Sequence, residues 1–353
     1  MTMKVSLSEI GRWLACAVSL LLASASVQAA KPIVWIYTDM SDRNIPGGND
    51  KGTVNDPDDI SAMAGYLLLF NEFDTRGIVV ASTHRRQHKT SGDQALWANN
   101  YFGAAYRQAL PHLNQAIGGF PADVSFVQSC IKESGELFSS NKDYPDLAKY
   151  PTVRALLDLA RKETNQINVL CWGSLTEPAI LVKHCLATGH VDVLKRLRFV
   201  AHWTDSPLHQ GSPEHPENVA NCREDASACA YMKQRALAGI IAFYECGAIG
   251  QHGIVSGSPK GTEYFNQFKV SPLGKIFVEG KFAHNSVDHS DAATYWTLLG
   301  NWGVSLADIA ANGTNSPEIE RRNESKFKAH SKRIHDELLR RAKAAAGSRN
   351  PEN

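Results

Sequence analysis

Short apolar runs alternate with amphipathic segments along this chain, and that alternation constrains the fold more than any other feature of the sequence. Runs rich in β-branched and aromatic residues predict buried strands at residues 33–38, 77–82, 167–172 and 197–203. Apolar residues at helical spacing predict helices at residues 58–70, 92–107, 151–163, 177–187 and 225–238. The predicted fold class is therefore α/β, with a mostly parallel sheet, helices on both faces and a Rossmann-like core. Ligands of such sheets bind outside the carboxyl ends of the strands, where polar segments follow these runs.

The beginning of the chain predicts export. Lys4 and Arg12 precede an apolar run at residues 14–27, and small residues follow as far as Ala30. This order is typical of a secretory signal peptide, and the run is shorter than the roughly 20 residues that span a bilayer. We expect residues 1–30 to be removed, leaving a periplasmic or extracellular protein without a stable membrane anchor. The alternative is an N-terminal membrane helix that stays attached.

Charge and cysteine content narrow the function further. The 37 Lys and Arg residues balance 36 Asp and Glu residues, which argues against a nucleic-acid partner bound through its phosphates. Six cysteines follow residue 30, and an exported chain permits disulfides. Cys222 and Cys229 are close enough in sequence for a disulfide between them to close a local loop. Cys171 could form a disulfide or, just as well, be a buried free thiol. No CxxC spacing occurs, so a structural zinc site is disfavoured.

The densest chemical signal lies between the first predicted strand and the first predicted helix. Residues 39–59 contain six aspartates against one Arg and one Lys. Carboxylates at short range raise one another's pKa unless a cation lies among them, and Ca²⁺ accepts several carboxylate and carbonyl oxygens. The segment therefore predicts a metal site at the edge of the sheet. The alternative is a solvated acidic loop in which Asp58 caps the helix.

These aspartates resemble the opening motif of the inosine-uridine-preferring nucleoside hydrolases, in which a strand ends in D-x-D-x-G-x-D-D before a helix. Thr38-Asp39 and Asp58-Asp59 correspond to the two halves of that motif, with a longer insertion between them. Residues 56–82 (DPDDISAMAGYLLLFNEFDTRGIVVAS) are more similar still to the nucleoside hydrolase-like domain of some secreted, cellulose-associated bacterial proteins. Residues 173–176, 221–228 and 290–292 resemble three later motifs of the family, in the family's order.

The resemblance implies the nucleoside hydrolase fold over residues 31–317 and hydrolysis of an N-glycosidic bond in a small-molecule nucleoside or related glycoside. Asp39 is implied as the general base for the metal-bound water, and Asp58 and Asn221 as substrate-binding residues. The implied calcium ligands are Asp39, Asp59, Asp291 and the carbonyl oxygen of Thr176.

Departures from the family pattern leave the leaving-group acid unassigned. Ser290 stands where the family often has His, and His289 lies one residue earlier; Val219 replaces an acidic residue and Glu177 an Asn. Further candidates for the acid or the pocket wall are His84, Trp172, His202 and His284. These departures favour the alternative of a carbohydrate- or nucleoside-binding protein that keeps the metal but has lost turnover. An O-glycoside hydrolase is a third alternative.

Two features of the chain's organisation stay open at this point. Residues 318–353 form a charged helix and tail, interpreted as a solvated terminal helix or, alternatively, a partner-binding one. The oligomeric state is undetermined, with a homo-oligomer as one alternative.

Overall fold

The computed structural model describes residues 30–45, 56–84, 91–211, 215 and 218–347. It divides the chain into two compact units, Met1–Lys31 and Pro32–Asn353. The predicted signal peptide lies, apart from Ala30, outside the described residues. No helix in the described ranges is long and apolar enough to cross a membrane.

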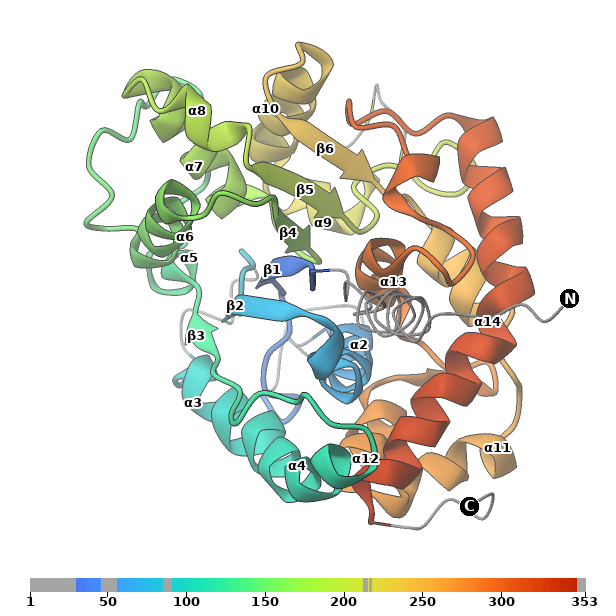
Figure 1. Cartoon of the computed structure of the whole chain (residues 1–353). Helices are drawn as coiled ribbons and strands as arrows, with labels where there is room; N and C mark the ends of the chain where they lie inside the picture. Colours follow the sequence, from blue (N-terminus) through green and yellow to red (C-terminus); the bar gives the residue numbers. More distant parts are fainter. Residues whose placement is uncertain (1–29, 46–55, 85–90, 212–214, 216–217, 348–353) are drawn as a thin grey trace, which may run out of the picture. The chain divides into compact units, whose positions relative to one another are not determined.

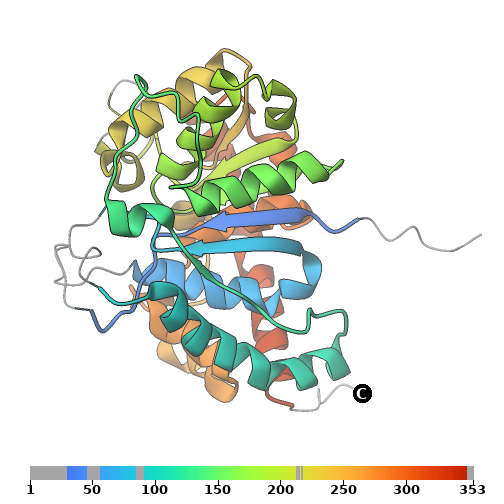
Figure 2. The ribbon, with the colours of Figure 1, turned by 90° about the vertical axis from the view of Figure 1, so that its left-hand side faces the viewer.

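A parallel sheet forms the centre of the larger unit (Figures 1 and 2). Within the described ranges it has six strands, in the order β3-β2-β1-β4-β5-β6. They are β1 (Ile33–Tyr37), β2 (Asp74–Val80), β3 (Val127–Gln128), β4 (Ile167–Cys171), β5 (Leu197–Ala201) and β6 (Ala242–Glu245). Because β1 pairs with both β2 and β4, the order of the strands reverses at this point. The crevice outside such a reversal is the usual ligand site of an open α/β sheet.

Helices cover both faces of the sheet, as Figure 1 shows. Alternate residues of β1 serve the two cores: Val34 and Ile36 face one, while Trp35 and Tyr37 face the other. The first core is closed by α2 (Pro57–Leu68), α4 (Ala104–Ala116), α12 (Pro272–Gly280), α13 (Ala293–Leu299) and α14 (Pro317–Ala345). The second is closed by α6 (Pro151–Lys162), α7 (Thr176–Ala187), α8 (Val191–Leu194) and α10 (Ala226–Leu237). The predicted fold class is confirmed.

Shorter elements complete the unit. Several flank the carboxyl ends of the strands, and others extend the longer helices. They are η1 (Phe70–Glu72), α3 (Gln94–Ala98), η3 (Asn99–Gly103), α5 (Cys130–Ser134), α9 (Ala220–Arg223), η5 (Gly250–Val255), α11 (Thr262–Asn266), η6 (Gln267–Val270), β7 (Phe282–Ala283), β8 (Ser286–Val287), η7 (Ser290–Ala292) and η8 (Leu306–Asp308). The helix predicted at residues 92–107 is therefore α3, a π-helical turn and α4, which runs on to Ala116.

The last helix, α14, differs from its prediction. It packs against the sheet's helical layer and buries Phe327, Ile334 and Leu338 in the first core. Arg341 is 5% exposed and donates hydrogen bonds to the Leu68 carbonyl oxygen at 3.2 Å and to Asn71 Oδ1 at 2.6 Å. A solvated terminal helix is thus wrong, because apolar residues at helical spacing form a buried stripe among the charges.

The cysteine predictions agree with the structure. Cys222 of α9 and Cys229 of α10 form a disulfide, which staples the segment between these two helices. Cys171, the last residue of β4, is a buried free thiol.

Candidate functional site

A pocket of about 170 Å³ opens beyond the carboxyl ends of β4 and β5. It combines carboxylates on one side with aromatic and amide side chains on the other. Its lining residues are Asp56, Asp58, Asp59, Trp172, His202, Trp203, Gln210, Val219, Asn221 and Asp291.

Two buried carboxylates meet in this pocket. Asp59 lies in the first turn of α2, where Pro57 begins the helix and the helix dipole favours negative charge. Asp291 lies in η7, and both side chains are at most 2% exposed. Burial raises the pKa of Asp59 well above its usual value, and the charges of Asp291 and Asp56 raise it further. The Thr38 hydroxyl donates a hydrogen bond to Asp59 and partly offsets these effects.

Asp39 lies beside these two carboxylates, just after β1. It is 1% exposed and is not among the residues that line the pocket. The pKa of Asp291 is raised first by burial and then by neighbouring charges, including that of Asp39. The turn after β4 packs directly on Asp39: a Cβ at Gly173 would stand 2.6 Å from the Asp39 Cβ. Only glycine permits this approach, so Gly173 holds Asp39 at the strand reversal.

Asp58 has a cationic partner, Lys281. Lys281 Nζ lies 2.9 Å from Asp58 Oδ2 and 2.8 Å from Asp288 Oδ2. Burial alone would lower the pKa of Lys281, but the two carboxylates outweigh it and raise the pKa. Asp58 Oδ1 has no hydrogen-bond partner among the described residues, so one oxygen remains for a ligand.

The opposite wall is built from the ends of β4 and β5. Trp172 is 1% exposed, and its indole N–H donates to Thr294 Oγ1 at 2.7 Å. His202 is 5% exposed, and its Nε2 lies 3.7 Å from Asp291 Oδ1. Burial lowers the pKa of His202 to about 3, so the imidazole is neutral at physiological pH. Asn221 donates from Nδ2 to the carbonyl oxygen of His202 at 2.9 Å.

Trp203 shows backbone strain at the pocket. Its φ of 42° lies in the left-handed region, which a bulky residue rarely adopts. Its ring meets those of His202 and His252 edge-on, with centroids 6.1 Å apart in each pair. Strain of this kind concentrates at ligand sites, where the surrounding structure enforces it.

Other predicted site residues lie outside the pocket lining. Thr176 begins α7, is buried, and donates from its hydroxyl to Asp225 Oδ2 at 2.6 Å. His84 Nε2 lies 2.7 Å from the same hydroxyl. His289 is directed toward α14, where its Nε2 lies 3.0 Å from that of His335. The roles of Thr176 as a ligand and of either histidine as an acid stay predictions.

The donor chemistry of the pocket fits Ca²⁺. Asp59 and Asp291 supply carboxylate oxygens whose negative charges oppose each other in a buried setting, and a hard divalent cation relieves that repulsion. The described side chains do not form a preassembled cage, since no group of three or more His, Cys, Asp or Glu residues among them has the spacing to hold a metal ion. Further oxygens would have to come from backbone carbonyls, water or substrate.

Comparison with known proteins supports the family resemblance. Residues 50–202 match the family model described as "Cellulose-binding Sde182, nucleoside hydrolase-like domain". The predicted resemblance to the nucleoside hydrolase-like domain is confirmed. A nucleoside hydrolase-related hypothetical protein from Saccharophagus degradans, associated with carbohydrate metabolism, shares the fold with a TM-score of 0.60. The two are 15% identical, and the match covers 91% of this chain and 73% of that one.

Two further comparisons concern a second solved structure and the curated proteins. The inosine-uridine preferring nucleoside hydrolase from Bacillus anthracis aligns with 89% of this chain and 100% of its own, at 12% identity and a TM-score of 0.43. No curated protein matches the chain in sequence.

The sequence did not predict Lys281 as a neighbour of the pocket. Lys281 lies 223 positions from Asp58, and a lone lysine between α12 and β7 carries no local signal. Asp288, the second ion-pair partner of Lys281, also carries no local sequence signal that predicts this contact. Gln210, in the loop after β5, also lines the pocket and was not predicted to do so.

Proposed function

We propose that this protein is an exported, calcium-dependent hydrolase that cleaves the N-glycosidic bond of a nucleoside or a related small-molecule glycoside. The observation that carries the proposal is the buried pair Asp59 and Asp291 in an open pocket at the strand reversal. The nucleoside hydrolase-like family match makes this reaction class a natural candidate.

Each residue has a chemical task in this proposal. Asp59, Asp291, Asp39 and the Thr176 carbonyl would hold Ca²⁺, which when bound positions and polarises the attacking water. Asp39 accepts the proton of that water as general base while the water oxygen bonds to the anomeric carbon and the C–N bond breaks. The electron pair of that bond leaves with the base, which takes up a proton from solvent. The carboxylates stabilise the positive charge that develops on the sugar in an oxocarbenium-like transition state.

The remaining pocket residues bind the substrate. The open oxygen of Asp58 accepts a hydrogen bond from a sugar hydroxyl, and Asn221 borders the same space. Trp172 and Trp203 offer flat walls to a sugar or a base. Since the pKa of His202 is lowered to about 3, this imidazole serves as a hydrogen-bonding group rather than as the acid that protonates the leaving group.

A second candidate is a carbohydrate- or nucleoside-binding protein without turnover. The ion pair between Lys281 and Asp58 favours it, because the ammonium neutralises a carboxylate that the hydrolase proposal assigns to sugar binding. Val219, which is 3% exposed and lines the pocket, also favours it, because it leaves an apolar surface where the family resemblance implies an acid. The family description as cellulose-binding suits this candidate as well.

The test measures calcium binding and base release in parallel. Isothermal titration of the mature chain with CaCl₂ gives binding, and a nucleoside panel with detection of free base gives turnover. Asp59→Asn is the test variant, and Asp146→Asn, which removes an exposed charge elsewhere, is the control. We expect Asp59→Asn to lose both signals and the control to keep both.

Each other outcome decides a specific point. Unchanged calcium binding in Asp59→Asn would refute the metal assignment. Nucleoside binding without base release, at high enzyme and long times, would replace the hydrolase with the binding protein. Release of reducing sugar from oligosaccharides would indicate the O-glycoside hydrolase instead.

Export is part of the proposal and has its own test. We expect the protein recovered from the periplasm or medium to begin at Lys31, after cleavage behind Ala30. N-terminal sequencing checks this, and an intact Met1 in that fraction would contradict it.

A further inference from the structure

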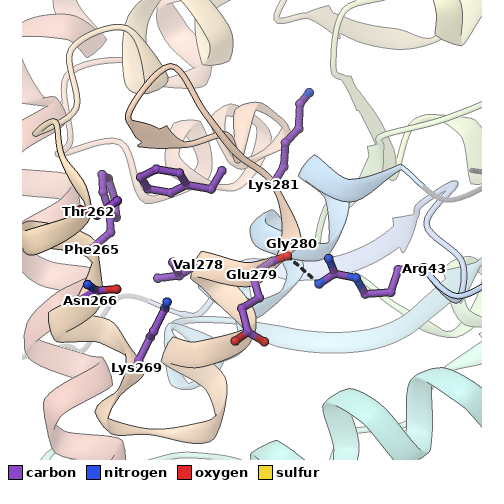
Figure 3. Close-up of a pocket in the computed structure, with 10 residues that line it drawn as sticks. Arg43, Thr262, Phe265, Asn266, Lys269, Val278, Glu279, Gly280 and Lys281 are labelled. Carbon is purple, nitrogen blue, oxygen red and sulfur yellow. Dashed lines mark hydrogen bonds between the residues drawn. The ribbon is translucent and has the colours of Figure 1, made fainter. Parts of the chain in front are cut away.

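A second and larger groove, of about 700 Å³ (Figure 3), shares no lining residue with the acidic pocket around Asp59 and Asp291. It is an open groove, and its walls come from three separate parts of the chain. Its lining residues are Arg43, Thr262, Phe265, Asn266, Lys269, Val278, Glu279, Gly280, Lys281 and Phe282.

One wall is a single helical face. Thr262, Phe265, Asn266 and Lys269 lie three or four residues apart on α11 and η6, the spacing that aligns side chains on one side of a helix. The facing wall is the end of α12 and the start of β7. Arg43 joins the walls from the loop after β1, where its Nη1 donates to the Glu279 carbonyl oxygen at 2.7 Å.

Two exposed cationic side chains, Arg43 and Lys269, line the groove. Lys269 is exposed and makes no hydrogen bond or ion pair within the described part of the chain. Arg43 is also exposed, and a guanidinium has five N–H donors arranged to bind carboxylate or phosphate. Glu279 is the one acidic residue of the lining, against Arg43 and Lys269, while the ammonium of Lys281 is paired with Asp58 and Asp288. The groove therefore carries net positive charge.

An aromatic surface lies beside these cations. Phe282 is 38% exposed, which is unusual for a phenylalanine. Phe265 is buried and meets it edge-on, with centroids 5.6 Å apart and an interplanar angle of 80°. This contact fixes an open ring face on which a sugar or base ring could stack.

Lys281 connects the groove to the acidic pocket. It lines the groove, while its ammonium pairs with Asp58, which lines the pocket. Figure 3 shows its side chain extending away from Lys269 and Glu279. Lys281 thus links the lining of the groove to that of the pocket, and a ligand longer than a single sugar ring could extend from one toward the other.

We propose that this groove is a subsite for an anionic group, a phosphate or a carboxylate, carried by the same substrate whose sugar lies in the acidic pocket. Arg43 and Lys269 bind the anion, and Phe282 stacks on an adjacent ring. The claim that one molecule occupies both cavities rests on the proposed function. The claim that the groove binds anions is independent of it. The substrate class then narrows to glycosides that bear a phosphate or a uronic acid.

The experiment compares charged sugars with their neutral parents. Full mature protein is titrated calorimetrically with ribose 5-phosphate and ribose, and with glucuronate and glucose, at low ionic strength. The test variants are Arg43→Gln and Lys269→Gln, whose exposed side chains make loss of folding a minor concern. Lys195→Gln is the control, because it removes one exposed positive charge just before β5, at the opposite end of the sheet.

We expect at least one anionic sugar to bind more tightly than its neutral parent, and the tighter of the two identifies phosphate or carboxylate. Arg43→Gln should weaken anion binding about tenfold, as expected for the loss of charge-assisted hydrogen bonds. Lys269→Gln should weaken it about threefold, whereas Lys195→Gln should not.

Two results would overturn the subsite. One is equal affinity for charged and neutral sugars, and the other is the same loss in Lys195→Gln as in Arg43→Gln, which would indicate a diffuse field effect. Failure of the proposed function looks different: base release and calcium binding would be missing while the preference for the anion persists.

Discussion

Replacing Lys281 tests the electrostatics of the pocket most directly. Lys281→Met keeps the aliphatic stem but removes the ammonium from between Asp58, at 2.9 Å, and Asp288, at 2.8 Å. The side chains of Lys281, Asp58 and Asp288 are 24%, 16% and 6% exposed, so the pairs are largely but not fully desolvated. Breaking a fully buried pair costs about 3–5 kcal/mol, whereas an exposed pair contributes about 1 kcal/mol or less. We therefore expect the free energy of unfolding to fall by about 2–3 kcal/mol.

Urea denaturation in calcium-free buffer measures this loss, with Lys195→Met as a control that should leave the midpoint unchanged. The double variant Lys281→Met with Asp288→Asn completes a cycle that isolates the pair. If the ammonium stabilises the fold by compensating Asp288, the double variant should lose at least 1 kcal/mol less than the sum of the single losses. Losses that add within about 0.5 kcal/mol would refute the reasoning, because the side chains would then act independently.

Three further predictions concern the surroundings of the pocket. Gly173→Ala should displace Asp39, because the new Cβ would stand 2.6 Å from the Asp39 Cβ. We expect the free energy of unfolding in urea to fall by about 1–3 kcal/mol and calcium binding to weaken in calorimetry. Unchanged values would contradict the close contact. Replacing Cys222 and Cys229 together by Ser should lower the free energy of unfolding by about 2.5 kcal/mol, because the unfolded chain gains entropy without the disulfide. A reductant should lower the stability of the wild type by the same amount and leave that of the variant unchanged. Burial lowers the pKa of His335 to about 4, whereas an unfolded His titrates near about 6.5. The unfolded state therefore binds more protons at this site between these values, so the contribution of His335 to stability should be constant above pH 6.5 and decline as the pH falls toward 4. His335→Leu should make the loss of stability between pH 6.5 and 4 less steep than in the wild type in thermal melts, and an equal slope would contradict the assignment.

The sequence predicted strands well where the apolar run was long enough to show its character. β1, β4 and β5 are five-residue strands in which at least four residues are β-branched, aromatic or otherwise apolar, and each was predicted within two residues of its observed ends. β3 has two residues and β6 has four, which is too short for periodicity to separate a strand from a loop. The edges of the sheet were therefore missed, while its centre was predicted.

The pocket followed the same logic. Asp59 lies at the start of a predicted helix, and Trp172 and His202 lie at the ends of two predicted strands. A parallel sheet brings such positions together at the edge formed by the carboxyl ends of its strands. Lys281 could not be predicted, because its role depends on how α12 packs on α2. The orientation of the His289 side chain could not be predicted either, because the backbone rotation at the start of η7 decides whether the imidazole faces the pocket or α14.

The long separation between the pocket's residues also has a consequence for how the chain folds. Asp56 and Asp291 border one cavity, yet about two thirds of the chain lies between them in sequence. The core beneath α2 needs Phe327 and Leu338 from α14, which emerge later still. Contacts this distant in sequence form slowly, because most of the loop-closure entropy must be overcome before they contribute stability. The core around α2 is therefore complete only after the last helix of the chain has been made.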